Sequence, residues 1–258
     1  TSAHPKKVIN TQYKTVLDPV HKVPASKKSK NYVQIVQNSV VVLNPKQKQR
    51  GLTFAPEIRP KFISGDRLGF VVAHETPIVT NWCMQSNGFQ HLSTMPAHSS
   101  PITKIAYESS LSIAAAGHSD GHVSVFQMIL GVTARVFKAL KPSPVDNILI
   151  SKSGDVYVVQ NTGTKGVVSI FSPNGELVAA ATVVLPIVDA VVTSFPDGVK
   201  QNLIFVLTED GDVNGYDAKD LNPTPMKMHH ENPMYLEITG ANCLRVVCPD
   251  SAEYEYKI

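Results

Sequence analysis

The chain has 258 residues, 43% of them hydrophobic, and its charges nearly balance at a formal net of +3. A single all-β domain can reach this length, and the apolar share is enough for a sizeable core. There is no apolar run of transmembrane length, no secretory pattern at the start, and no disulfide framework among three cysteines. We therefore expect a cytoplasmic protein. Because the chain begins at Thr1 rather than at methionine, we also expect it to be part of a longer one.

The positive charge is concentrated near the N-terminus. Residues 1–50 hold ten Lys or Arg and one acidic residue, a net of +9, whereas the other 208 residues carry a net of −6. One interpretation is a contact with anionic lipid, at the periphery of an intracellular membrane, or with an acidic partner. The other is a solvated arm and loop. No nucleic-acid partner is predicted, because the ordered aromatics that stack bases are missing there. The candidate contact residues are Lys27, Lys28, Lys30, Lys46, Lys48 and Arg50.

Along the chain, apolar segments that alternate or run together predict strands. The first is a loosely alternating segment over residues 8–17, inside the basic segment 1–30. A pair follows at residues 32–36 and 40–43, and another at residues 68–73 and 78–82. Their spacing is less regular than that of the segments that follow.

From residue 101 onward a turn recurs every 45 residues. Its copies are Asp120-Gly121, Lys165-Gly166 and Asp210-Gly211, and an alternating apolar run follows each. Each unit opens with proline and a β-branched residue, and a more polar stretch such as residues 176–183 closes it. A glycine turn between two such runs predicts a hairpin. Four strands in about 40–45 residues is the size of one blade of a β-propeller.

Six such units fill the chain. Their third strands are predicted to end near residues 43, 82, 126, 171, 216 and 256, an average of 43 residues per unit. This rhythm predicts one all-β domain over residues 1–258, a propeller of six to seven four-stranded blades. The sixth unit stops two residues after Tyr256, without an outer strand. Because an uncovered strand edge invites aggregation, we expect residues 8–17 to supply that strand.

A competing motif lies at residues 117–121, Gly-His-Ser-Asp-Gly, which match the nucleophile elbow G-x-S-x-G of α/β-hydrolases. A serine hydrolase with Ser119 as nucleophile is therefore an alternative, and its triad would draw on Asp189 or Asp217 and His229 or His230. An elbow leads into a helix, however, whereas a bulky alternating pattern follows Gly121, and the turns at Gly166 and Gly211 have no such serine. We interpret Ser119 as a turn residue and expect no enzymatic activity.

No metal or cofactor site is predicted. The histidines at 229 and 230 and the cysteines at 243 and 248 lack the spacing of a zinc site, and no glycine-rich phosphate loop is present.

The unit from His98 to Phe126 resembles a WD-repeat. A histidine follows a small residue at Ala97-His98, and Asp120 occupies the turn between the second and third strands. The Trp-Asp pair that ends the family's third strand is replaced by Phe126-Gln127, and correspondingly by Phe171-Ser172 and Tyr216-Asp217. The resemblance implies a structural hydrogen-bonding role for His98 and Asp120. The structural repeat positions are His98, Asp120, Gly121, Gly166, Asp210 and Gly211.

A narrower resemblance covers residues 98–181, which look like the C-terminal propeller of BEACH-domain proteins, the neurobeachin and beige-type group. It is carried by Ile148-Leu-Ile-Ser151-x-x-Gly154 and by Phe171-Ser-x-x-Gly175-x-Leu177, with an outer strand led by Asn174-Gly175. BEACH proteins are large cytoplasmic scaffolds of vesicle and lysosome traffic. The resemblance therefore implies a non-catalytic scaffold of that kind, with a BEACH domain in the same chain. A WD-repeat adaptor of another complex is the alternative.

The predicted partners are proteins or peptides held on one propeller face. Loops on a rigid β scaffold are the usual place for such contacts. We expect them in the loops that precede each first strand, around His98, Ser143 and Leu185.

Overall fold

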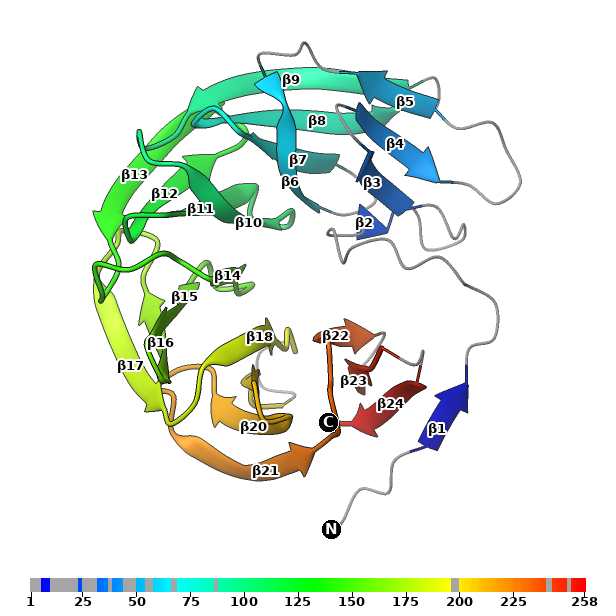
Figure 1. Cartoon of the computed structure of the whole chain (residues 1–258). Coiled ribbons are helices and arrows are strands. Elements are labelled where there is room, and N and C mark those ends of the chain that lie inside the picture. Colours follow the sequence, from blue (N-terminus) through cyan, green and yellow to red (C-terminus); the bar gives the residue numbers. More distant parts are fainter. Residues whose placement is uncertain are drawn as a thin grey trace. The chain divides into compact units, whose positions relative to one another are not determined.

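The structure is a computed structural model that describes residues 6–9, 23–24, 32–36, 39–43, 50–53, 58–65, 69–85, 88–195, 200–239, 243–249 and 252–258. These residues form β-strands and turns, with no α-helix among them (Figure 1). The described part accordingly offers no helix of the length and apolar character that a membrane crossing requires.

The strands make six four-stranded antiparallel sheets. In five of them the strands lie side by side in chain order, so each sheet is a meander of hairpins. The first three sheets are β2 (Val23–Pro24), β3 (Tyr32–Val36), β4 (Ser39–Leu43), β5 (Arg50–Thr53); β6 (Pro60–Gly65), β7 (Gly69–His74), β8 (Ile78–Gln85), β9 (Gly88–Pro96); and β10 (Ile102–Glu108), β11 (Ile113–His118), β12 (His122–Gln127), β13 (Val132–Lys138). The next two are β14 (Asn147–Ile150), β15 (Val156–Thr162), β16 (Lys165–Phe171), β17 (Leu177–Val183); and β18 (Ile187–Val192), β19 (Leu203–Thr208), β20 (Asp212–Asp217), β21 (Pro223–His229).

The sixth sheet combines the two ends of the chain. Its order is β1-β24-β23-β22, with β22 (Tyr235–Thr239), β23 (Cys243–Val247), β24 (Ala252–Lys257) and β1 (Lys6–Ile9). Strand β1 runs antiparallel to β24, with Lys6 opposite Glu255 and Ile9 opposite Ala252. An N-terminal strand thus covers the edge of β24. It begins two residues before the segment 8–17 expected from the sequence, and residues 10–17 lie outside the described residues.

The third strand of every sheet lies where the repeat predicts it. Strands β4, β8, β12, β16, β20 and β24 end at residues 43, 85, 127, 171, 217 and 257, within three residues of the predicted ends. The all-β prediction and its four-stranded repeating unit are therefore confirmed, and the described residues contain six such units.

The chain divides into two compact units. Unit 1 comprises Thr1–Val16, Val159–Phe171 and Leu177–Ile258, and unit 2 comprises Leu17–Val158 and Ser172–Glu176. In unit 2 one apolar cluster joins the sheets β6–β9 and β10–β13, with Met95, Ile102 and Phe126 fully buried. In unit 1 another joins β18–β21 to β22–β24, with Phe205 and Leu244 at its centre. In each of these two pairs, a sheet buries one face against the sheet that follows it in sequence. The assignment of residues 1–258 to one domain stays a prediction.

The glycine repeat has a packing reason. Gly121 and Gly211 have positive φ angles of 83° and 89°, which an L-residue adopts only with strain. A Cβ on Gly121 would lie 2.6 Å from the carbonyl oxygen of Lys141, and one on Gly211 would overlap that of His230. In both cases the loop toward the next sheet packs directly on the glycine.

The prediction that Lys165-Gly166 forms a turn is wrong. The reversal between β15 and β16 is at Gly163, with φ 65°, and Gly166 lies inside β16. Gly166 resembles Gly121 and Gly211 in one respect, because the chain leading to the next sheet packs closely on it. A Cβ at Gly166 would lie 2.5 Å from Cγ1 of Ile187. The 45-residue period therefore marks the contact with the next loop, and in this sheet the turn comes three residues earlier.

A β-bulge recurs at the aromatic residue of the third strand. The register of β8, β12, β16 and β20 with the strand that follows shifts at Trp82, Phe126, Phe171 and Tyr216. These are the positions that correspond to the tryptophan of the WD-repeat pattern. Bulges of this kind bend a strand and are features of a fold rather than defects, so this position has the same backbone form in four sheets.

Candidate functional site

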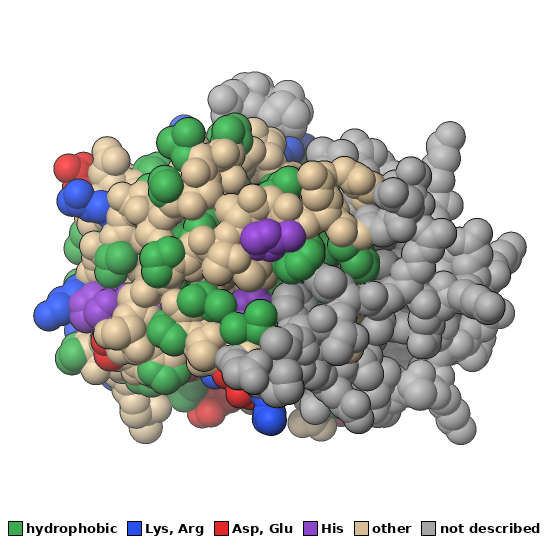
Figure 2. Space-filling view, turned by 90° about the horizontal axis from the view of Figure 1, so that it is seen from above, with side chains coloured by type: hydrophobic (Ala, Val, Ile, Leu, Met, Phe, Trp, Pro, Cys, Tyr) green, Lys and Arg blue, Asp and Glu red, His purple; other side chains and the backbone are tan. Residues whose placement is uncertain are grey.

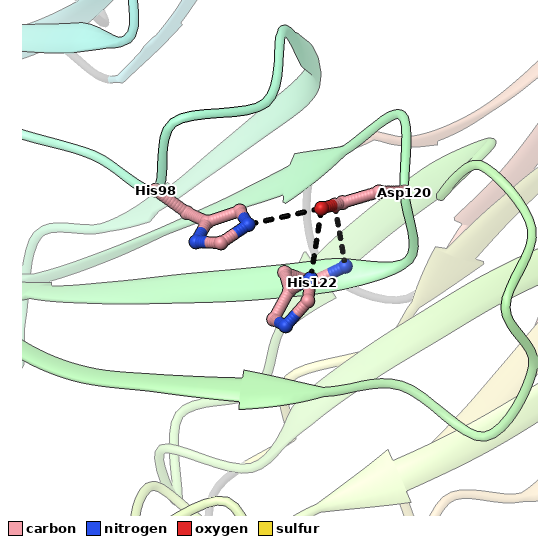
Figure 3. Close-up of side chains that lie close together, drawn as sticks. All are labelled: His98, Asp120 and His122. Carbon is pink, nitrogen blue, oxygen red and sulfur yellow. Dashed lines mark hydrogen bonds and ion pairs between the residues drawn. The ribbon is translucent and has the colours of Figure 1, made fainter.

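Two histidines and one aspartate converge at one end of the sheet β10–β13 (Figure 3). His98 precedes β10, Asp120 lies in the turn between β11 and β12, and His122 is the first residue of β12. His98 Nε2 is 2.9 Å from Asp120 Oδ2, and His122 Nδ1 is 3.0 Å from the same oxygen. The two imidazoles stack with their centroids 4.0 Å apart and an angle of 27° between their planes. Both histidines thus meet one carboxylate oxygen.

The turn itself holds Asp120 in place. Its second oxygen, Oδ1, accepts a hydrogen bond of 3.2 Å from the backbone N–H of His122. This is the local side-chain turn that favours aspartate before glycine. Asp210 makes the same bond with the backbone N–H of Asp212, also at 3.2 Å. In both turns the aspartate carboxylate thus accepts a backbone N–H of the turn.

A buried histidine, His118, belongs to the hydrogen-bond network that positions His98. His118 and Ser124 have no exposed surface. His118 Nδ1 lies 2.8 Å from the carbonyl oxygen of Ser100, so Nδ1 carries the proton, and Nε2 accepts from the Ser124 hydroxyl at 2.9 Å. The Ser124 oxygen in turn accepts the backbone N–H of His98 at 3.1 Å, and the His98 ring stands edge-on to that of His118. The position of His98 is thus fixed by a satisfied polar network.

The preceding sheet contains the same pair. His74 Nδ1 faces the carbonyl oxygen of Ile58 at 2.9 Å, and its Nε2 lies 2.8 Å from the hydroxyl of Thr80, which also accepts the indole N–H of Trp82. The sequence analysis missed this repeat. Its signal was available, because His74 and His118 are 44 residues apart, and so are Thr80 and Ser124.

The electrostatics follow from these contacts. Burial lowers the pKa of His118 and of His74, because the charged imidazolium is poorly solvated there. Burial raises the pKa of Asp120, but hydrogen bonds from Ser100, from the His122 backbone and from His98 outweigh it and hold that pKa well below its usual range. Asp120 is therefore anionic at neutral pH.

A second carboxylate is neutralised in a different way. Asp212, beside the predicted positions Asp210 and Gly211, lies 2.7 Å from Lys227 Nζ and 2.9 Å from His229 Nδ1. These two partners on β21 lower the pKa of Asp212. The Asp212 carboxylate is thus paired with one lysine and one histidine, whereas the Asp120 carboxylate is paired with two histidines.

Ser119 does not form a nucleophile elbow. Strands β11 and β12 are antiparallel neighbours, with Gly117 opposite Val123, so the motif is a hairpin turn without a following helix. The Ser119 backbone N–H donates to the carbonyl oxygen of Pro101 at 3.0 Å. The histidines and aspartates considered for a triad have other partners. His230 Nε2 bonds the Tyr256 hydroxyl and His229 Nδ1 lies beside Asp212, while Asp189 accepts the N–H of Leu236 and Asp217 that of Lys219. The interpretation of Ser119 as a turn residue is confirmed.

The other predicted contact residues fall in two groups. The loops at Ser143 and Leu185 pack against the repeat glycines, since the Gly166 N–H donates to the carbonyl oxygen of Leu185 at 3.0 Å and Ser143 lies against Gly121. Whether those loops bind a partner stays a prediction. Arg50 is the first residue of β5. The remaining basic candidates, Lys27, Lys28, Lys30, Lys46 and Lys48, lie outside the described residues.

Two solved structures resemble the chain. They are crystal structures of BBS1N in complex with ARL6DN, one soaked with lead and one with mercury, with TM-scores of 0.75 and 0.70 at 13% and 14% sequence identity. The first similarity covers 94% of this chain and 79% of the other, and the second covers 88% and 75%. BBS1N is a β-propeller. The chain has the β-propeller fold.

Sequence comparison adds no family to this fold. No protein-family model matches the chain, and no curated protein does. In all, 1518 solved chains match by structure, so the propeller fold alone does not select a function. The function of this propeller has to be argued from its own side chains.

Proposed function

We propose that this propeller is a non-catalytic interaction module, and that the turn between β12 and β13 is one of its protein contacts. The main observation behind this proposal is a pair of adjacent, solvent-exposed aliphatic residues. Ile129 is 78% exposed and Leu130 is 72% exposed. On the face shown in Figure 2, hydrophobic side chains lie in small groups among polar ones. Two adjacent exposed aliphatic side chains form a small apolar patch that a partner protein could cover.

Hydrogen bonds and packing hold the backbone of this turn, and a preorganised backbone lowers the entropy that binding would cost. Met128 is buried in the core just before the pair, and its N–H donates to the carbonyl oxygen of Ser112 at 2.9 Å. The Ile129 N–H donates to the side chain of Gln127 at 3.1 Å, and Gly131, with φ 65°, closes the turn against Ser93. These contacts fix the backbone from which the aliphatic pair projects.

A structural neighbour supports a protein as the partner. BBS1N, which shares the propeller fold, was crystallised in complex with ARL6DN. A protein partner is thus compatible with this architecture.

The finer proposal is a propeller of a BEACH-type scaffold in vesicle or lysosome traffic. The two segments that carry the resemblance form the same turn. Gly154 N–H donates to the carbonyl oxygen of Ser151 at 3.0 Å, and Gly175 N–H to that of Ser172 at 2.9 Å. Both glycines have positive φ, and in both turns the serine hydroxyl accepts the N–H four residues on. The recurrence of this turn at β14–β15 and β16–β17 is the observation that supports the proposal. It predicts that the coding sequence upstream of Thr1 encodes a BEACH domain, and an upstream region without one would refute it.

The partner proposal is tested by replacing the aliphatic pair. Proteins recovered from cell extract with the purified chain would be identified, and each would then be titrated against purified chain by calorimetry. We expect the double variant Ile129→Ser, Leu130→Ser to weaken binding of a genuine partner at least about tenfold, since two buried aliphatic side chains contribute about 1.5–3 kcal/mol each. The matched control is Val184→Ser, which removes a side chain of equal exposure, 79%, in unit 1. If no recovered protein binds saturably, or if both variants bind as the wild type does, the proposal fails.

We further propose a peripheral location at intracellular membranes, supported by the net charge of +9 over residues 1–50. Binding to vesicles that contain phosphatidylserine should exceed binding to pure phosphatidylcholine and should fall as salt rises. The variant Lys27→Glu, Lys28→Glu, Lys30→Glu should abolish the difference. Equal sedimentation with both kinds of vesicle would leave the solvated-arm interpretation as the correct one.

A further inference from the structure

The cluster His98–Asp120–His122 has the donor atoms of a metal site. Two imidazole nitrogens and one carboxylate oxygen lie within 4.8 Å of one another, and no other such group of three occurs in the described part of the chain. Nitrogen from histidine and oxygen from aspartate are ligands that Zn²⁺ accepts, and imidazole suits the transition ions rather than Mg²⁺ or Ca²⁺. These ligand atoms thus favour a divalent transition-metal ion such as Zn²⁺ over Mg²⁺ or Ca²⁺.

The distances leave little to rearrange. Ligand atoms about 2.0–2.1 Å from a tetrahedral ion are separated by about 3.4 Å. The two nitrogens are now 2.9 Å and 3.0 Å from Asp120 Oδ2, so each separation has to open by only a few tenths of an ångström. The two nitrogens lie within 4.8 Å of each other, and the stacked rings are partly exposed, so the rings have to rotate for both nitrogens to point at one ion, and they border solvent on a side where they can do so.

One nitrogen of the cluster lacks a satisfactory partner. His122 Nδ1 is buried, and its one close partner is Asp120 Oδ2 at 3.0 Å, an ion-pair contact that falls short of a well-directed hydrogen bond. The oxygen lies within ion-pair distance but off the direction in which the ring nitrogen donates. A buried polar atom without a hydrogen bond is unfavourable. A metal ion bound to Nδ1 would remove this deficit.

The surroundings are those of an accessible, prepared site. The side chains of His98, His122 and Asp120 are 26%, 20% and 38% exposed, so the cluster borders solvent, and a shift of the Asp120 carboxylate would open His122 Nδ1 to an ion. The backbone N–H of His98 is fixed by Ser124, and Asp120 is held by its turn. Such secondary contacts orient metal ligands. Three protein ligands leave a fourth position open to water, as in zinc sites that exchange a ligand.

The geometry points to a binding site for one divalent transition-metal ion, of which Zn²⁺ is the representative, held by His98 Nε2, an Asp120 carboxylate oxygen and His122 Nδ1. The site is independent of the proposed partner contact at Ile129 and Leu130. The Asp212 cluster provides the internal comparison, because Lys227 already neutralises that carboxylate and only one histidine is present there.

The test uses the purified chain, stripped of metal with a chelator and then dialysed. Titration with zinc chloride should show saturable binding of one ion per chain. The variants His98→Gln and His122→Gln should each weaken binding at least about tenfold, since even secondary contacts of metal ligands contribute 10–100-fold. The matched control His229→Gln, at the Asp212 cluster, should bind as the wild type does. Absence of saturable binding at millimolar zinc, or equal affinity in all variants, would overturn the site.

A second measurement does not depend on how the variants fold. In chain labelled with ¹⁵N-histidine, zinc should shift the side-chain nitrogen signals of His98 and His122 among the nine histidines. The midpoint of thermal unfolding should also rise with zinc and return on addition of chelator, because a ligand that binds only the folded state stabilises it. Shifts at other histidines with none at these two would contradict the assignment.

Discussion

Replacing Gly211 by alanine should destabilise the folded chain by about 3 kcal/mol. The positive φ of 89° costs an L-residue about 1–2 kcal/mol. The new methyl group also overlaps the carbonyl oxygen of His230, and such overpacking adds about 1–3 kcal/mol. Because the obstacle is backbone, held by the His230 N–H bond to the Gly211 carbonyl oxygen, it cannot rotate away. Urea unfolding followed by circular dichroism measures the loss.

Gly163 supplies the control for this experiment. It has a positive φ of 65°, but nothing lies within 4 Å of where its Cβ would be. Gly163→Ala should therefore cost only about 1–2 kcal/mol, from the backbone alone. Equal losses in the two variants would show that the close approach of the loop at His230 contributes nothing to stability.

Acidification from pH 7 to pH 5.5 should destabilise the chain steeply. Burial lowers the pKa of His74, His118 and His230, so the folded state keeps these imidazoles neutral while the unfolded chain protonates them below about 6.5. Below that pH the unfolded state binds more protons than the folded state, and stability falls as pH falls. Each histidine contributes at most about 1.4 kcal/mol per pH unit. Urea unfolding at several pH values gives the slope.

The pH window separates these histidines from the aspartates. Asp120 and Asp212 have lowered pKa values, so their contribution is present above the unfolded pKa of 3.8 and disappears only as pH falls below it. The free energy of unfolding of the variant His118→Gln should depend less steeply on pH between pH 6.5 and pH 5.5, by the contribution of one proton. Its pH dependence in the more acidic region should be unchanged. A free energy of unfolding that stays constant from pH 7 to pH 5.5 would contradict the neutral, buried state of these rings.

Much of the fold could be predicted because the sequence repeats a local geometry. Glycine at 121 and 211 is dictated by a positive φ and by the loop that packs on it, and both constraints recur with the sheet. The failure at Gly166 has the same origin. At Gly166 only the close packing of the next loop is retained. The turn is at Gly163, so the 45-residue spacing of the glycines no longer marks the turn in this sheet.

The candidate site was only half predictable. His98 and Asp120 follow a known repeat pattern, but His122 is an ordinary first residue of a strand, and only the hairpin returns its ring to Asp120. His74 and His118 escaped notice because they end apolar strands, where burial hides a polar partner from any pattern of alternation. Contacts that depend on side-chain direction at a turn are set by the folded backbone.

The pairing of β1 with β24 has a consequence for biosynthesis. Lys6 and Glu255 are opposite each other, so β1 is synthesised some 250 residues before the strand that it pairs with. At about 5–20 residues per second, translation of that stretch takes roughly 10–50 s. The four strands of the sheet β10–β13 are consecutive in the chain, so this sheet can form during synthesis while β1 still lacks its partner.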